Sequence, residues 1–213
     1  MAAEQSHRHM TPTHITHYHL ADRRPFLNLS DLADDALQQV LDELNARRSA
    51  DAGYQRFFGR RYMQLRRLTE ARMHELFVAA GGRPERQSPH YFVLGSSEWF
   101  RRLAADTRAI SLALNALPAD QLSFTYPDSF TAMGFGPQFG LPHVARPYHG
   151  QVFRLEALEE VVAQYGLPAD EPDAGHADYH LKPFEKYIEV QLWSDAPIAS
   201  LLQQVDTLAR VQV

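Results

Sequence analysis

Apolar residues at helical spacing predict two helices in the first half of the chain. The first runs from the capping residue Ser30 to about Arg48, and the second from about Tyr54 to Ala80, where two glycines end it. We therefore expect a helical hairpin over about residues 30–82. The apolar stripes of the two helices are Leu37, Val40, Leu41 and Leu44, and then Phe58, Tyr62, Leu65, Met73 and Leu76.

Short apolar or alternating runs predict strands in most of the remaining chain. They contain β-branched and aromatic residues and are bounded by glycine, proline or polar turns. The region between Tyr126 and Gly150 is rich in glycine and proline, which indicates a long loop. The expected strands are 13–20, 90–95, 109–114 and 151–155, the expected short helices are 96–100 and 156–165, and a last helix begins near Pro197.

The run from Tyr187 to Trp193 has the most informative pattern. Its period of two predicts a strand with Tyr187, Glu189, Gln191 and Trp193 on one face and aliphatic residues on the other. A carboxylate between aromatic side chains is costly to bury unless another group pairs with it or uses it. Glu189 is therefore the leading candidate for a functional residue, although a purely structural role is also compatible with the pattern.

The order of the elements, helices first and strands afterwards, indicates an α+β fold. We expect a small mixed or antiparallel sheet with the helical hairpin packed against it, in a single domain over residues 13–213 whose strand-containing core spans about 88–213. Residues 1–12 are polar and aperiodic, and Met10 resembles a second start, so a disordered leader or tag is expected there. Neither a Walker loop nor a Gly-x-Ser-x-Gly elbow occurs, which argues against common nucleotide-binding and serine-hydrolase folds.

Composition narrows the function classes further. The chain has 213 residues and no cysteine, and the absence of cysteine excludes disulfides, thiolate catalysis and zinc-thiolate sites. Its net charge of −5 argues against a dedicated duplex-binding protein. No apolar run approaches the roughly 20 residues that span a bilayer, so we expect a cytoplasmic protein that does not enter a membrane. Residues 47–108 carry 13 Lys and Arg against 6 Asp and Glu, a basic region that fits either solvated helix faces or a phosphate-bearing partner.

Three clusters could carry chemistry. His17 and His19 point the same way on a strand and could share a metal with a third ligand, or simply be structural histidines. In the segment 123–130, Tyr126 and Asp128 lie at a strand end where they either line a pocket or form an ordinary turn. The third cluster is Arg146, Tyr148 and His149. Together they could bind a phosphate and stack on a base, or they could simply anchor a loop.

Three fragments together resemble the ADP-ribosyltransferase fold, particularly the group that contains DNA-directed toxins. Residues 18–22 resemble its opening strand, residues 123–129 are similar to the segment where a strand pair meets a short turn, and the Glu189 strand with Ala196-Pro197-Ile198 resembles its closing catalytic-glutamate strand. The fragments cover about 30 of the 213 residues. The long helical segment before His90 is larger than the usual insertion, and no Ser-Thr-Ser motif follows a strand.

The resemblance implies a bacterial-type transferase that cleaves NAD as its substrate. Glu189 would stabilise the ribosyl cation, His19 would hold a ribose, and Tyr126 would stack the nicotinamide, with Arg146, Tyr148 and His149 as further nucleotide-binding residues. Two alternatives remain open: a histidine-centred metal-dependent enzyme, and a non-catalytic binding protein that uses the arginine-rich face of the second helix. A nucleic-acid partner stays undecided at this point.

Overall fold

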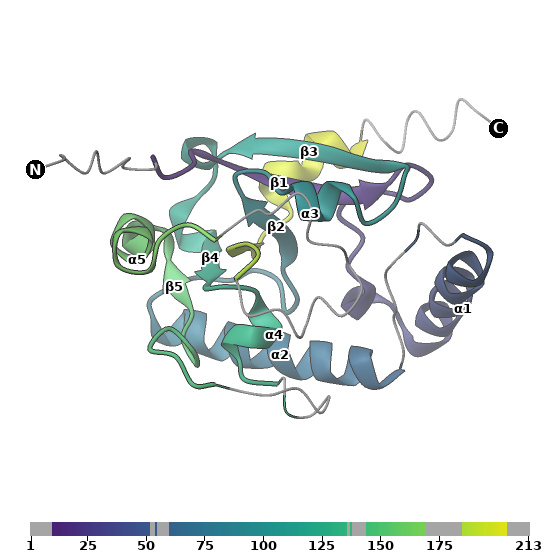
Figure 1. Cartoon of the computed structure of the whole chain (residues 1–213), viewed down its shortest axis with the longest axis horizontal. Helices are drawn as coiled ribbons and strands as arrows, with labels where there is room; N and C mark the ends of the chain where they lie inside the picture. Colours follow the sequence, from purple (N-terminus) through teal and green to yellow (C-terminus); the bar gives the residue numbers. More distant parts are fainter. Residues whose placement is uncertain are drawn as a thin grey trace, which may run out of the picture.

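Six antiparallel strands form one sheet in the computed structural model, which describes residues 10–51, 54, 60–135, 137, 144–168 and 185–203 (Figure 1). The strand order is β3-β1-β2-β6-β4-β5. The expectation of an α+β fold is confirmed. The strands are β1 (His14–Leu20), β2 (His90–Leu94), β3 (Thr107–Ala113), β4 (Leu122–Thr125), β5 (Phe153–Arg154) and β6 (Glu189–Leu192).

The sheet register fixes which side chains share a face. Strand β6 lies between β2 and β4, and Glu189 stands opposite Val93 on one side and Thr125 on the other. Because successive side chains of a strand alternate, Glu189 and Gln191 lie on one face and Val190 and Leu192 on the other. All four residues of β6 are buried.

The main hydrophobic core lies on the face opposite Glu189. Helix α5 (Leu158–Tyr165) covers this face, and Ile198 of the short helix η7 (Ala196–Ile198) packs into it. Side chains of three central strands contribute there, among them Phe92, Phe124, Val190 and Leu192.

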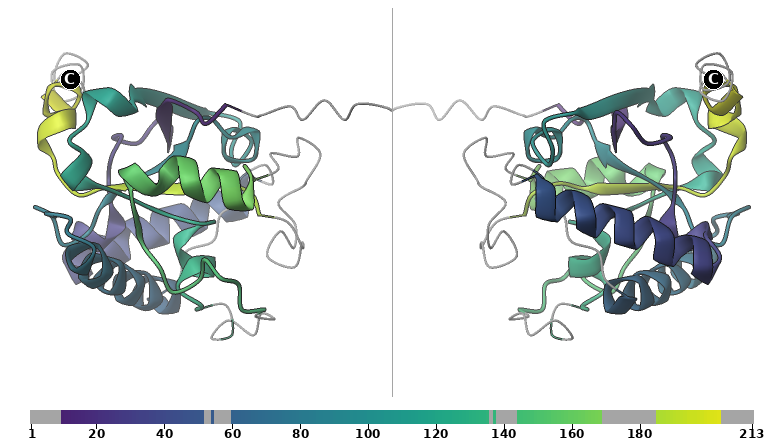
Figure 2. Two further views of the ribbon diagram at one scale, coloured as in Figure 1. Left: turned by 90° about the vertical axis from the view of Figure 1, so that its left-hand side faces the viewer. Right: turned by 90° about the vertical axis from the view of Figure 1, so that its right-hand side faces the viewer.

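Helices α2 (Arg60–Ala79), α3 (Glu98–Arg101) and α4 (Ser129–Ala132) lie on the Glu189 side, where the sheet carries mostly polar residues. Met73 and Phe77 of α2 pack on Trp193, all three fully buried. Figure 2 shows the sheet between α5 and the long helices. The sheet therefore separates two interiors, an apolar one opposite Glu189 and a more polar one on the Glu189 side. Most of the large aliphatic residues are buried in the apolar interior.

Helix α1 (Asp34–Ala50) starts later than the sequence predicted. The Asn28 side chain accepts a hydrogen bond from Ser30 N–H and caps a short helix, η1 (Leu29–Asp31), so Ser30 is inside that turn rather than capping α1. Residues of α1 pack against Met63 at the first part of α2, and Arg67 pairs with Asp34 at 3.0 Å. The two helices thus meet near one end of each (Figure 2), and the predicted start of the second helix lies mostly outside the described residues.

Other expected elements differ from the structure in extent. Strand β5 has two residues instead of the predicted five, and the helical segment that follows begins with the short turn η5 (Leu155–Ala157). The predicted loop after Tyr126 contains α4, because the Asp128 carboxylate accepts a hydrogen bond from Thr131 N–H at 3.0 Å and caps that helix. In the described part of the chain, no helix combines the length and apolar character that crossing a bilayer requires.

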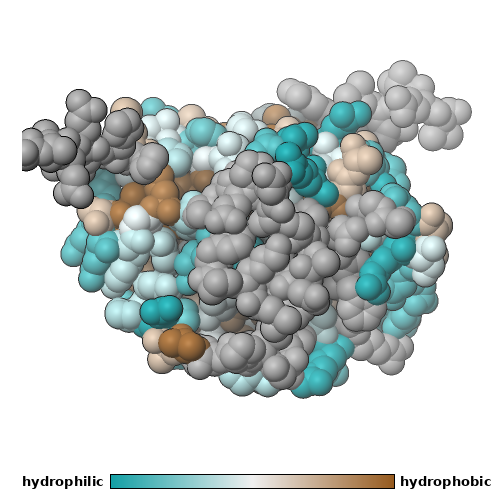
Figure 3. Space-filling model, in the orientation of Figure 1, coloured by the Kyte–Doolittle hydropathy of each residue, from teal (hydrophilic) through white to brown (hydrophobic). Residues whose placement is uncertain are grey.

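The surface seen in Figure 3 is mainly hydrophilic. Apolar side chains reach it as small separate spots, and the exposed large ones come from different segments, such as Leu27, Leu68 and Val144. Scattered apolar residues of this kind are normal on a protein surface and need no partner to cover them.

Two leucines on α2 provide a test of this packing. Leu65→Ala should lower the free energy of unfolding by about 2–4 kcal/mol, because Leu65 is 5% exposed and its loss leaves a cavity. Leu68→Ala on the same helix should change it by less than about 0.5 kcal/mol, because Leu68 is 57% exposed. Urea unfolding of both variants measures the difference, and equal losses would contradict the placement of α2.

Candidate functional site

Glu189 is a buried carboxyl group at the centre of the sheet. It is 7% exposed, and its Oε1 accepts a hydrogen bond from the Gln191 side-chain N–H at 3.2 Å. No Lys or Arg of the described residues lies within ion-pair distance of it; the nearest cationic influence is Arg66 on α2. The carboxyl group is therefore shielded from water, and the described part of the chain does not lock it in an ion pair.

A chain of hydrogen bonds along the polar face orients Gln191 toward Glu189. The Trp193 indole N–H, which can only donate, donates to Ser123 Oγ at 2.8 Å. Ser123 in turn donates to Gln191 Oε1 at 2.8 Å, so the amide N–H groups of Gln191 must point to Thr125 and Glu189. The direction of this chain fixes Glu189 as an acceptor.

Helix α2 places a second set of polar groups above the same face. The Arg66 guanidinium lies 3.7 Å from the centre of the Tyr91 ring and donates through Nε to Glu70 Oε1 at 3.1 Å. Tyr91 also donates to Glu70 Oε1, at 2.8 Å, as does Asn28 at 3.3 Å. Glu70 is 2% exposed, and no described residue forms a hydrogen bond with its other oxygen.

Burial dominates the electrostatics of the site. It raises the pKa of Glu189, while Arg66 acts in the opposite direction and the Asp128 carboxylate adds to the rise. Burial also raises the pKa of Tyr91 well above its ordinary range, so Tyr91 is a hydrogen-bond donor at neutral pH. Burial alone would lower the pKa of Arg66, but the adjacent Tyr91 and the acidic groups raise it, so the guanidinium stays charged.

Helix α4 closes one side of the site. Its first residue, Ser129, is fully buried, and its hydroxyl lies near enough to lower the pKa of Glu189, although the two groups do not form a hydrogen bond of good geometry. Asp128 influences Glu189 and also Glu185, whose pKa is raised mainly by burial. The Asp128 carboxylate therefore acts on two other carboxyl groups at this end of β6.

Aromatic rings lie on the Glu189 face toward the β1 side of the sheet. Tyr18 follows Thr16 by two residues on β1, and Thr16 aligns with Val93 and so with Glu189, which puts Tyr18 on the Glu189 face. The Tyr187 ring stacks on Trp99 at 5.9 Å and meets Phe100 edge-on at 4.8 Å. Phe100 also stacks on Tyr18 at 5.6 Å. We call these four residues the aromatic wall.

His19 lies on the opposite face of the sheet from Glu189. Thr16 of β1 aligns with Val93, which aligns with Glu189, so the odd-numbered His19 points the other way. Its Nδ1 donates to the main-chain oxygen of Leu20 at 2.8 Å. The structure therefore does not bring His19 and Glu189 together. The prediction that paired them did not take the register of β1 into account.

Tyr126 and Tyr148 pack against each other at 4.7 Å in the apolar core. Tyr126 is 3% exposed and donates its hydroxyl hydrogen to Tyr165 O at 3.0 Å, while Tyr148 donates to Glu185 Oε1 at 2.8 Å. Both rings contribute to packing at the end of the sheet where Asp128 lies, but Tyr126 is on the other face from Glu189.

Arg146 and His149 form the turn before β5. Arg146 N–H donates to His149 Nδ1 at 3.3 Å, and the His149 ring meets Tyr148 edge-on at 5.0 Å. Arg146 is exposed and lowers the pKa of Glu185 through its charge. Arg146, Tyr148 and His149 thus lie in one turn, where the Tyr148 hydroxyl binds Glu185 rather than Glu189.

The predicted histidine pair lies on one face of β1, but its rings have other partners than a metal. The rings of His17 and His19 stack with centres 6.0 Å apart. However, His17 Nδ1 donates to Tyr91 O at 2.9 Å and its Nε2 accepts from Phe26 N–H at 2.9 Å, so neither nitrogen offers a lone pair. Within the described ranges, no three histidine, aspartate or glutamate side chains converge as metal ligands would.

Comparison of the chain with protein-family models, with curated proteins and with solved structures finds no match. The function of this chain is therefore inferred from the geometry of the site alone.

Sequence reasoning missed Arg66, Glu70 and the ring contacts of the aromatic wall, although it placed Tyr187 on the Glu189 face. A signal for the first two was available, since Arg66 follows Tyr62 by four residues and Glu70 precedes Met73 by three, which puts both charges inside the apolar stripe of the helix. No comparable signal exists for the wall, because its rings come from three separate elements.

The raised pKa predicts that Glu189 costs stability. Above its folded pKa the carboxylate is ionised in both states and its burial is unfavourable, whereas below about 4.5 it is protonated in both states and the cost is absent. Glu189→Gln should therefore stabilise the protein at pH 7.5 by about 0.5–2 kcal/mol, the usual range of single stabilising substitutions. The gain should shrink as the pH falls toward 4.5.

Urea unfolding at a series of pH values checks this prediction. Glu75→Gln, on the exposed side of α2, is the matched control and should show little change at any pH. A loss of stability in Glu189→Gln at pH 7.5 would mean that the carboxylate is favourably paired and would contradict the described environment.

Proposed function

We propose that this chain is an enzyme that cleaves the N-glycosidic bond of NAD and transfers the ADP-ribosyl group, with Glu189 stabilising the ribosyl cation. The observation that supports it is a buried carboxyl group, oriented by a one-way chain of hydrogen bonds, to which the described residues supply no ion pair. A carboxylate in such a position costs stability, which is typical of a functional residue.

The chemistry needs one well-placed negative charge. As the bond between the ribose and the nicotinamide breaks, its electron pair goes to the nicotinamide nitrogen, and positive charge develops on the ribose. A carboxylate held in a low-dielectric site stabilises that charge more than water does. An acceptor hydroxyl or amine then bonds to the ribose carbon and loses its proton.

The remaining groups of the site have defined parts in this proposal. Arg66 opposes the effect of burial on Glu189 and so favours the ionised form that the reaction requires. The aromatic wall, rather than Tyr126, is suited to stack the nicotinamide ring, because it lies on the same face as Glu189. No role is assigned to His19, which lies on the other face.

Removal of the Glu189 charge tests the proposal. Glu189→Gln should lower the kcat of nicotinamide release from NAD by at least about 10²-fold, because one electrostatic stabiliser of a transition state is lost. Glu75→Gln, a surface change, should leave kcat within about twofold of the original protein. Release of nicotinamide can be followed by chromatography, and binding by the thermal shift with NAD and ADP-ribose. The absence of both turnover and thermal shift in the unmodified chain would end the proposal.

Two tyrosines test which ring contacts the nicotinamide. Tyr187→Ala should raise the KM for NAD by roughly 2- to 10-fold, the equivalent of one ring contact, while Tyr187→Phe should keep it. Tyr126→Phe should leave KM unchanged and lower the free energy of unfolding by about 0.5–1.5 kcal/mol through the lost hydrogen bonds. A rise of KM in Tyr126→Phe but not in Tyr187→Ala would reverse the assignment.

A further inference from the structure

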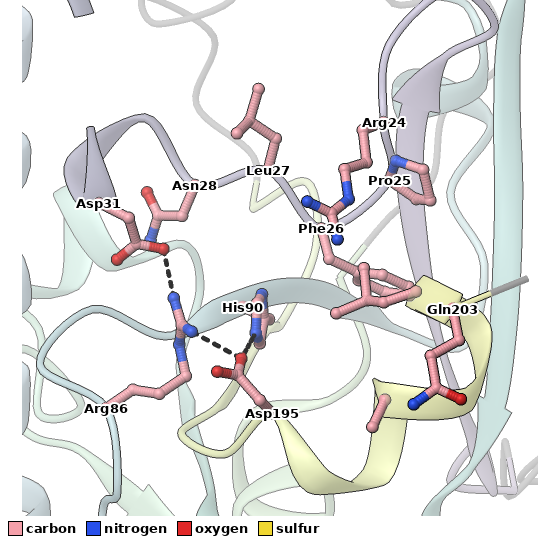
Figure 4. Close-up of a pocket in the computed structure, with 12 residues that line it drawn as sticks. Arg24, Pro25, Phe26, Leu27, Asn28, Asp31, Arg86, His90, Asp195 and Gln203 are labelled. Carbon is pink, nitrogen blue, oxygen red and sulfur yellow. Dashed lines mark hydrogen bonds and ion pairs between the residues drawn. The ribbon is translucent and has the colours of Figure 1, made fainter. Parts of the chain in front are cut away.

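A separate pocket of about 440 Å³ lies on the other face of the sheet from Glu189, between the loop after β1 and the C-terminal helical turn (Figure 4). His90, the first residue of β2, lies at its base, and because it alternates with Tyr91 its ring points away from the polar face. A volume of this size is in the range of small-molecule sites. None of the groups proposed for NAD cleavage lines it.

Three of the four charged side chains that line the pocket pair with one another. Arg86 pairs with Asp31, pairs with Asp195 at 2.6 Å, and donates from Nε to Ser88 O at 2.9 Å. Two arginines and two aspartates line the pocket in total, so its lining has no excess of formal charge. A strongly charged ligand would therefore find little net attraction there.

His90 is held as a neutral hydrogen-bond acceptor. Burial lowers the pKa of its imidazole, and the hydrogen bond to Asp195 only partly offsets this. Nε2 donates to Asp195 Oδ1 at 2.6 Å, so in the neutral ring Nδ1 carries the free lone pair. The side chain is 4% exposed, and among the described residues Nδ1 has no hydrogen-bond partner, a state that costs free energy until a donor reaches it.

Figure 4 shows the second ring nitrogen of His90 on the side away from Asp195, toward the loop that carries Phe26 and Leu27. This loop contributes three apolar residues to the lining, Pro25, Phe26 and Leu27, and Phe26 meets the His90 ring edge-on at 5.9 Å. Phe26 has a φ of 60°, in the left-handed region that a bulky residue seldom adopts. The loop thus holds the Phe26 ring against the imidazole of His90, whose Nδ1 accepts no hydrogen bond from the described residues.

We propose that this pocket binds a neutral aromatic or heteroaromatic molecule that carries one O–H or N–H group, and that this group donates to His90 Nδ1. The apolar walls take the ring, and the donor satisfies the buried acceptor. Nδ1 has almost no surface open to water, so a small movement of the Phe26 or Leu27 side chain accompanies binding. An anion is disfavoured because Arg86 directs Nε, Nη1 and Nη2 at protein acceptors.

Phenol and toluene are suitable probes, since they share a ring and differ in the donor. With the full chain labelled at histidine with ¹⁵N, phenol should shift the signal of the unprotonated His90 nitrogen and bind roughly tenfold more tightly than toluene, the effect of one hydrogen bond. His90→Phe should abolish the preference, and His14→Phe, a change outside the pocket, should keep it. Equal affinities, or phenol binding that leaves the His90 signal unchanged, would overturn the proposal.

The comparison of the two probes on the unmodified chain remains decisive if His90→Phe does not fold. The experiment uses no NAD and measures no turnover. Its failure would therefore leave the proposed function untouched, and failure of the proposed function would leave this pocket unaffected.

Discussion

Burying Glu189 in the middle of a sheet obliges the protein to replace the water that the carboxyl group loses. The cost of burying an ionised carboxyl is several kcal/mol unless other groups solvate it. The chain from Trp193 through Ser123 to Gln191 supplies one fixed donor, and Arg66 supplies a charge at longer range. The compensation is incomplete, as the raised pKa of Glu189 indicates. Most other features of the polar interior follow from this constraint.

Arg66 and Glu70 show the same constraint from the side of the helix. A guanidinium and a carboxylate buried together on α2 would be hard to place against an aliphatic face, but here they meet Tyr91, Tyr62 and Asn28. Ion pairs of this kind contribute little net stability, because the cost of removing both charges from water offsets their attraction. The two buried charges are therefore better explained by a functional site, where their electric field can act, than by a role in stabilising the core.

Alternation along the chain was enough to predict much of the fold. Strands β1, β2 and β3 and helix α5 occur within a few residues of the predicted positions, since each has a strong period and clear turn residues at its ends. The face shared by Glu189 and Gln191 also followed from the period of β6 alone. Boundaries such as the start of α1 did not, because Asn28 and Ser30 are both good capping residues and only the folded backbone selects between them.

The site itself needed information that a single sequence does not contain. Whether His19 or Tyr18 faces Glu189 depends on the pairing of β1 with β2, and a shift of one residue would exchange them. Likewise, Asp195 looks like a simple turn residue in the sequence, and only the structure brings it to His90 across 105 positions. Contacts between distant segments are set by the register of the sheet and not by local preference.

The same alternation that forms the core also forms the site, and this links the two. Val190 and Leu192 fill the apolar interior while Glu189 and Gln191 line the polar one, so each residue of β6 has a place on one side only. A slip of one residue would bury the carboxyl group among aliphatic side chains and turn two aliphatic ones toward Arg66. Both interiors thus reject the slipped register, since a carboxyl group buried among aliphatic side chains and buried polar groups that lose their partners each cost free energy. The costly carboxyl group therefore helps to specify the pairing of the strands that position it.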